Sequence, residues 1–200
     1  GGGRGRDGGG GGGEGVHWGW GGWRAGGEPG VKVALQAGER APGLVPPEGV
    51  RDHIRQAVEI AGARRSGQGV DILHEDDPDG LMAEMARRRV MVEINLTSND
   101  VILGIVGAGH PLNAYRAAGV PVALSTDDEG VSRIDLTHEY ARAATVYALD
   151  YAALRDLSRS GLEYAFVPGA SLWRGVMPFR MVAACASVPA GAVPDAGACH

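Results

Sequence analysis

Cysteines, long apolar runs and an excess of basic residues are scarce or missing in this sequence. Its two cysteines among 200 residues, Cys185 and Cys199, lie near the C-terminal end, and neither belongs to a Cys-x-x-Cys pair. They exclude a disulfide-stapled small domain and a zinc ribbon, and they favour a reducing, cytoplasmic setting. No apolar run approaches the roughly 18 residues of a membrane-spanning helix, and no segment is typical of a signal peptide.

The charge balance is mildly acidic. A formal net charge of -5 at pH 7 gives no general attraction to nucleic acid or to an anionic membrane. Hydrophobic residues make up 44% of the chain and charged residues 22%, which is ordinary for a globular domain with a sizeable core. We therefore expect neither nucleic acid nor a membrane as a partner.

Glycine is abundant and unevenly placed, with 16 of the 34 glycines in the first 27 positions. Residues 1–30 carry little apolar area to offset the entropy lost on ordering, so we predict that they are disordered. We predict a folded domain over residues 31–175 and a tail over residues 176–200.

Apolar runs alternate with segments of helical spacing after residue 30. Ile54, Val58 and Ala61 recur at helical intervals, and Asp77-Pro78 is a typical helix start. The predicted strands cover residues 31–36, 69–73, 90–96 and 120–125, and the predicted helices cover residues 50–63, 77–88, 111–118, 136–148 and 151–164. This alternation predicts an α/β protein with a parallel sheet.

Polar residues cluster around the predicted strands' ends. Gln36 and Glu39 follow the first strand, Gln68 opens the second, and Thr126-Asp127-Asp128 follows the fourth. Parallel α/β folds keep their binding sites at such ends. Taken alone, the two aspartates favour a polar strand exit that caps the next segment, and each glutamine fits an amide bonded to backbone.

Other polar motifs have structural readings. His110, before Pro111, fits a helix start, with a direct chemical role as the alternative. His74-Glu75-Asp76-Asp77 fits a solvated loop leading into a helix N-terminus, where acidic residues are favourable. Phosphate-binding loops, dinucleotide fingerprints and nucleophile elbows are missing.

Several blocks together resemble one family. Gln36-Ala37-Gly38-Glu39 is similar to a His-Ala-Gly-Glu motif, and Gly67-Gln68-Gly69-Val70-Asp71 to Gly-His-Gly-Val-Asp. Further blocks lie at 92–99, 110–112, 120–128, 162–166 and 171–173. From about residue 31 to 173, in order and spacing, the chain resembles the adenosine deaminase family, with bacterial adenosine-deaminase-like proteins the nearest in character.

The resemblance implies a fold. The family has a TIM-type (β/α) barrel of eight strands, of the metal-dependent amidohydrolase kind, and the four strands here resemble strands five to eight. The resemblance therefore implies a partial barrel. The family's His-x-His pair, which supplies two zinc ligands, has no counterpart in this sequence.

The resemblance also implies roles for five positions. Asp127 takes the place of a zinc-binding aspartate and Asp128 that of an aspartate that binds the purine. Glu39 takes the place of the glutamate that protonates the purine ring. Gln36 stands where the family has a zinc-binding histidine, and Gln68 where it has a histidine that activates the metal-bound water.

The two glutamines predict an impaired site. An amide is a weak ligand for zinc compared with imidazole, and it cannot exchange a proton near pH 7. The family reaction is hydrolysis of adenosine to inosine and ammonia, and we expect this chain to hold zinc weakly or not at all. The alternatives are a non-catalytic nucleoside-binding protein, or a half-barrel without autonomous function that self-associates through exposed strand edges.

Overall fold

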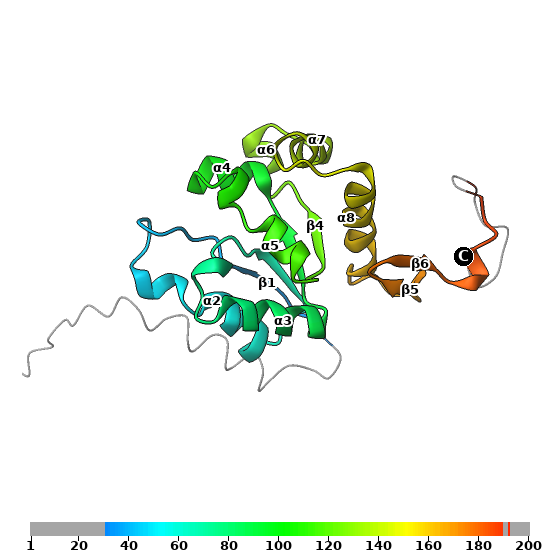
Figure 1. Ribbon diagram of the computed structural model, residues 1–200, viewed down its shortest axis with the longest axis horizontal. Coiled ribbons are helices and arrows are strands. Elements are labelled where there is room, and N and C mark those ends of the chain that lie inside the picture. The colour runs from blue at the N-terminus through cyan, green and yellow to red at the C-terminus, as the bar shows by residue number, and fades with distance from the viewer. Residues whose placement is uncertain (1–30, 190–191, 193–200) are drawn as a thin grey trace, which may run out of the picture.

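The computed structural model describes residues 31–189 and residue 192. The segment expected to be disordered, residues 1–30, lies outside the described residues, as does most of the final part of the tail. Four strands form one sheet in the order β1-β2-β3-β4, with every neighbouring pair parallel (Figure 1). They are β1 (Ala34–Ala37), β2 (Arg65–Gln68), β3 (Met91–Ile94) and β4 (Val122–Leu124). The predicted α/β architecture is confirmed.

Helical segments lie between the strands of the sheet and after the last of them, and several pack against it in one core. Ile54, Leu81, Leu112 and Tyr115 from these segments are fully buried in one core with the strand residues. The segments are η1 (Pro47–Val50), α2 (His53–Arg55), η2 (Gln56–Ile60), η3 (Ile72–His74), α3 (Pro78–Arg88), α4 (Leu96–Leu103), η4 (Gly107–Gly109), α5 (Leu112–Ala117), α6 (Glu129–Ser132), α7 (Leu136–Val146) and α8 (Tyr151–Glu163).

The second strand lies earlier than the apolar pattern predicted. It covers Arg65–Gln68, whereas residues 69–73, predicted as the strand, form a turn and the start of η3, so that prediction was wrong. Gln68 and Gly69 have φ angles of 77° and 61°, a left-handed pair that ends the extended backbone. Gln68 therefore closes β2, and the apolar residues Val70 and Ile72 are buried in the turn that follows.

Two of the predicted helices differ in how closely the structure follows the prediction. The helix expected over residues 50–63 is present over residues 53–60, where α2 continues directly into the π-helical η2. The start of α3 is as predicted, because Asp77 accepts a hydrogen bond from the Gly80 N–H at 3.1 Å and Pro78 opens the helix.

The other face of the sheet is polar and carries the exit of α8. Gln36, Gly67 and Glu93 lie in register across three strands. Arg65 forms an ion pair with Glu93 and donates to the Tyr164 carbonyl at 3.1 Å. The residues after α8 therefore lie near the amino ends of the strands on this face. They do not cover the carboxyl ends of the strands.

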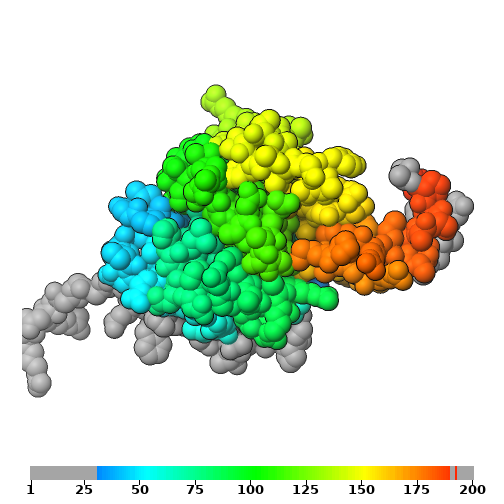
Figure 2. Space-filling model, in the orientation of Figure 1, coloured from blue at the N-terminus to red at the C-terminus, as the bar shows by residue number. Residues whose placement is uncertain are grey.

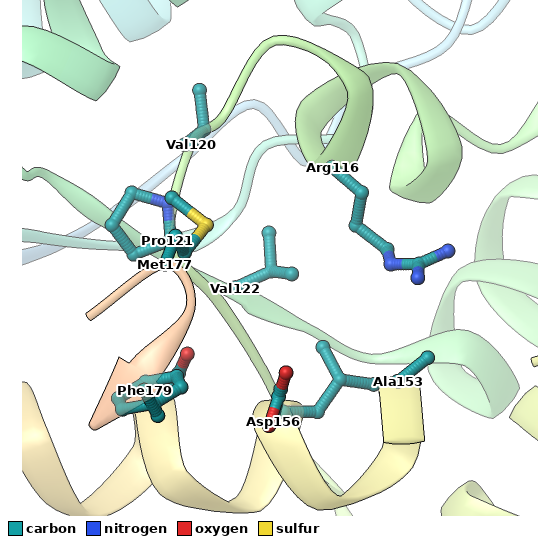
Figure 3. Close-up of a pocket in the computed structure, with 10 residues that line it drawn as sticks. Arg116, Val120, Pro121, Val122, Ala153, Asp156, Met177 and Phe179 are labelled. Atoms are coloured by element: carbon teal, nitrogen blue, oxygen red, sulfur yellow. The ribbon is translucent and has the colours of Figure 1, made fainter. Parts of the chain in front are cut away.

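A hairpin follows α8. Strands β5 (Trp173–Val176) and β6 (Phe179–Met181) pair antiparallel and span residue 175, where we expected the domain to end. Met177 and Phe179 line a cavity of about 170 Å³ together with Val120 and Pro121 at the start of β4 (Figure 3). In Figure 2 the hairpin, in orange, lies against the yellow surface of α8. This cavity is thus at the opposite end of β4 from Asp127.

Short features complete the fold. The 3-10 turn η5 (Ala183–Cys185) buries Cys185, which is disulfide-bonded. The cytoplasmic location predicted from the sequence stays a prediction. No helix in the described part of the chain is long and apolar enough to cross a membrane.

Candidate functional site

The turn after β1 requires glycine. Gly38 has a φ of 83°, and a Cβ there would lie 2.7 Å from both Asp71 Oδ1 and Ile54 Cδ1. Its N–H donates to His53 Nδ1 at 3.2 Å. Glycine at this position therefore allows the chain to turn tightly and place Glu39 directly after the strand's carboxyl end.

The turn after β2 is anchored from the core. A Cβ on Gly69 would lie 2.6 Å from the Tyr115 hydroxyl, and that hydroxyl donates to the Gly69 carbonyl at 2.7 Å. Tyr115 is fully buried in α5. The anchor holds the backbone on which Gln68 adopts its positive φ.

Gln36 is exposed and Glu39 is half-buried at the end of β1. Gln36 Nε2 donates to Glu39 Oε2 at 2.9 Å. Partial burial raises the pKa of the Glu39 carboxyl above its ordinary value, and the negative charges of Asp127 and Asp128 raise it further, while the Gln36 hydrogen bond lowers it. The structure thus brings Glu39, predicted from β1, into the field of the aspartates that follow β4.

Asp127 lies at the end of a buried hydrogen-bond network. Its Oδ2 accepts hydrogen bonds from Gln68 Nε2 at 3.0 Å and from the Ser98 hydroxyl at 2.7 Å. Gln68 Oε1 accepts from Asn99 Nδ2 at 2.6 Å, and Asn99 Oδ1 lies 3.0 Å from His110 Nε2. The sequence placed Gln68 and Asp127 at strand ends, and the structure adds Ser98, Asn99 and His110 as their partners.

The backbone at the two linked residues is unusual. Gln68 and Asp127 have φ angles of 77° and 55°, a conformation that side chains other than glycine rarely adopt. Asp77, Arg89, Arg133 and Ala148 adopt the same conformation outside the site, so it does not by itself mark a functional residue. Asp128 lies at the start of α6 without a side-chain capping bond, so the reading of these aspartates as a capped strand exit finds no support.

A cavity of about 220 Å³ lies beside these residues, on the polar face of the sheet. Gln36, Gln68 and Asp127 line it, together with Glu93 and Asn95, which the sequence analysis did not single out. Asn95 is 3% exposed, and its Oδ1 accepts a hydrogen bond from no other described residue. The sequence feature that could have indicated these lining residues is Glu93, a charged residue inside an otherwise apolar strand.

A second pair of carboxylates is buried behind the β1 and β2 turns. Glu75 is 4% exposed and accepts hydrogen bonds from the backbone N–H groups of Ile54 and Arg55, so the prediction of a solvated Glu75 was wrong. Asp71 is fully buried, and neither of its oxygens accepts a hydrogen bond from another described residue. Burial raises the pKa of each carboxyl to about 7.

The described side chains do not fit a tightly held zinc ion. Between residues 31 and 189, and at residue 192, no group of three His, Cys, Asp or Glu side chains is placed to hold a metal. Asp127 Oδ2 already accepts two hydrogen bonds, and the neighbouring Gln36 and Gln68 offer neutral amides. Structural and catalytic zinc sites instead use imidazole, thiolate and carboxylate ligands.

Sequence comparison finds long matches of one kind. The family model for adenosine deaminase matches residues 24–172. The adenosine deaminase of Shewanella loihica is 36% identical over 141 residues, which cover 70% of this chain and 39% of that protein. The chain thus spans about two fifths of the length of this curated relative.

Structural comparison finds the corresponding fold. Arabidopsis ADAL complexed with IMP has a TM-score of 0.53 and 27% identity, covering 68% of this chain and 36% of that one. An amidohydrolase from Burkholderia ambifaria with bound Zn has a TM-score of 0.56 at 19% identity, covering 70% and 36%. With the four-stranded parallel sheet, these likenesses confirm the predicted partial barrel.

Proposed function

The chain belongs to the adenosine deaminase family, and from that premise we propose that its described residues form the carboxylate side of a site for a purine nucleoside, adenosine being the first candidate. One observation carries the proposal: Glu39 lies in the electrostatic field of Asp127 and Asp128, although these residues come from opposite edges of the sheet. Three interacting carboxylates, of which Asp127 lines the cavity, suit a ligand rich in N–H donors and basic ring nitrogens.

Two of the carboxylates have distinct tasks in this proposal. The raised pKa of Glu39 lets its carboxyl hold a proton more readily than an ordinary glutamate, so it donates to a ring nitrogen of the purine. Asp128 makes no capping hydrogen bond to α6, and its carboxylate accepts from a purine N–H. The IMP complex of Arabidopsis ADAL supports a purine as the ligand class.

Zinc is where this chain departs from its family. A catalytic zinc ion supplies hydroxide at neutral pH by lowering the pKa of bound water. The side chains around Asp127 do not match such an ion, so we derive no step through it. We propose that the chain holds zinc weakly or not at all and that deamination of adenosine to inosine and ammonia is impaired.

Calorimetry with adenosine on the 200-residue chain tests the proposed binding. We expect a heat of binding that Glu39→Gln and Asp128→Asn each weaken about tenfold, the effect of losing one charge-assisted hydrogen bond. Asp79→Asn, an exposed change on α3, serves as the matched control and leaves binding unchanged. Absence of binding by the folded chain would overturn the proposal.

A second candidate is binding of a nucleoside without any turnover. Gln68 favours this candidate because its side chain has no titratable group. Its amide also forms hydrogen bonds to both Asn99 and Asp127. An assay for inosine and ammonia, with and without added zinc, separates the two candidates. Stoichiometric zinc on the purified chain together with rapid ammonia release would overturn both the impairment and this candidate.

The outer edge of β1 is the basis for the self-association expected from the sequence. Within the described residues β1 pairs only with β2, so its other edge presents unpaired backbone groups. We propose that this edge pairs with another chain. Sedimentation of the 200-residue protein tests it, and a monomer at every concentration would contradict it.

A further inference from the structure

A line of buried side chains runs from the start of α5 to the candidate site. Gln68, Asn99 and His110 are 1%, 0% and 4% exposed. They come from the end of β2, from α4 and from the residues before α5, and they end on Asp127. Water does not reach them, so each polar atom depends on its protein partner.

A backbone group determines the direction of every hydrogen bond in this line. The Leu112 N–H donates to His110 Nδ1 at 3.1 Å, so Nδ1 carries no proton and Nε2 carries it. His110 Nε2 therefore donates to Asn99 Oδ1, which turns the Asn99 amide so that Nδ2 faces Gln68. Turning either amide would set oxygen against oxygen or nitrogen against nitrogen.

The surroundings of His110 hold the ring neutral. Burial and the positive charge of Arg142 lower the pKa of His110 to about 4. The Tyr147 ring packs edge-on at 5.7 Å between centroids. A neutral ring with a single donor is what the line requires, because an imidazolium would also present a donor to the Leu112 N–H.

We infer that Asn99 and His110 are positioning residues that orient the side chain at position 68 as a hydrogen-bond donor to Asp127. The orientation keeps Oδ2 of Asp127 occupied. The same line would impose one tautomer on a histidine at position 68, which would accept from Asn99 Nδ2 and donate to Asp127. The importance of this for ligand binding rests on the proposed function, whereas the hydrogen-bond directions do not.

Nuclear magnetic resonance of the uniformly ¹⁵N-labelled chain tests the directions without any substitution. We expect the His110 ring to be protonated at Nε2 and bare at Nδ1, and the Gln68 amide protons to lie close to the Asp127 side chain. A ring protonated at Nδ1, or Gln68 amide protons directed at Asn99, would overturn the inference.

Asn99→Asp tests the consequence for the site. A carboxylate has no N–H for Gln68 Oε1, so the Gln68 amide turns over and its contact with Asp127 is lost. We expect the nuclear Overhauser contact to Asp127 to disappear and adenosine to bind about tenfold more weakly. Asn113→Asp, the same change on the exposed side of α5, is the matched control and alters neither readout.

The two measurements separate the two ideas. If the wild-type chain does not bind adenosine, the proposed function fails while the amide orientation is still decided by the spectra. If Asn99→Asp keeps the Gln68 contact with Asp127, the positioning role is wrong, whatever the affinity. If this variant does not fold, the tautomer and amide contacts of the wild-type chain decide the inference.

Discussion

Two buried polar clusters lie behind the same strand ends and meet burial in different ways. In the first, Gln68, Asn99 and His110 are neutral and joined by hydrogen bonds in one direction. In the second, Asp71 and Glu75 are carboxyls, and the oxygens of Asp71 accept from no other described residue. The comparison teaches that a paired neutral amide tolerates burial, whereas a buried carboxyl holds a proton more tightly, whether it accepts hydrogen bonds, as Glu75 does, or not, as with Asp71.

The largest effect is expected from Asp71→Asn, which removes the charge from the second cluster. The folded-state pKa of Asp71 is about 7, raised from 3.8, so its favourable contribution is present below pH 3.8 and is lost as the pH rises to 7. Above pH 7 the variant should be more stable than the wild type by up to about 4 kcal/mol. Urea unfolding at pH 4 and pH 8 measures the difference, and an equal gain at both values would contradict the raised pKa.

The first cluster should respond to acid in the opposite sense. The folded-state pKa of His110 is about 4, lowered from 6.5, so its contribution is present above pH 6.5 and is lost as the pH falls to 4. The stability gap between the wild type and His110→Gln should therefore shrink by about 3 kcal/mol between pH 7 and pH 4. Because the wild type and His110→Gln both contain Asp71 and Glu75, the contribution of these two carboxyls to the pH dependence cancels in the gap. A gap that does not change with pH would mean that folding does not lower the pKa of His110.

The two glutamines that stand at family histidine positions differ in burial, so replacing each should change the stability of the fold to a different degree. Gln68 is buried between Asn99 and Asp127, whereas Gln36 is exposed and bonds to Glu39. Gln68→Leu should lower the free energy of unfolding by about 2 kcal/mol because it leaves the buried Asn99 Nδ2 donor unpaired. Gln36→Leu, the matched change, should alter it by less than about 0.5 kcal/mol. Equal effects in chemical denaturation would show that burial does not distinguish the two positions.

The smallest effects concern Glu39 at the end of β1. Gln36→Leu removes the hydrogen bond that lowers the pKa of Glu39, so that pKa should rise further. Asp128→Asn removes a negative charge that raises it, so the pKa should fall. Titration of the Glu39 carboxyl carbon by nuclear magnetic resonance follows both shifts. Shifts of the same sign in the two variants would contradict the geometry around Glu39.

Much of the fold could be predicted because it rests on local signals. The helix start at Asp77-Pro78 and the apolar stretches that became β3 and β4 could be read from neighbouring residues. The second strand could not, since apolar residues in a buried turn and in a buried strand look alike at short range. Glu75 was misplaced for a related reason, because its burial depends on the backbone of α2, 20 and 21 residues earlier in the chain.

The sequence by itself determined the family, the alternation of strands and helices, and the residue types at the strand ends, including the two glutamines. Only the tertiary structure decided what those glutamines contact. Gln68 and Asp127 are 59 residues apart, and they meet because β2, β3 and β4 lie parallel with their carboxyl ends at one edge. The direction of their hydrogen bond depends in turn on His110, whose ring accepts locally from the Leu112 N–H and reaches Asn99 only in the folded core.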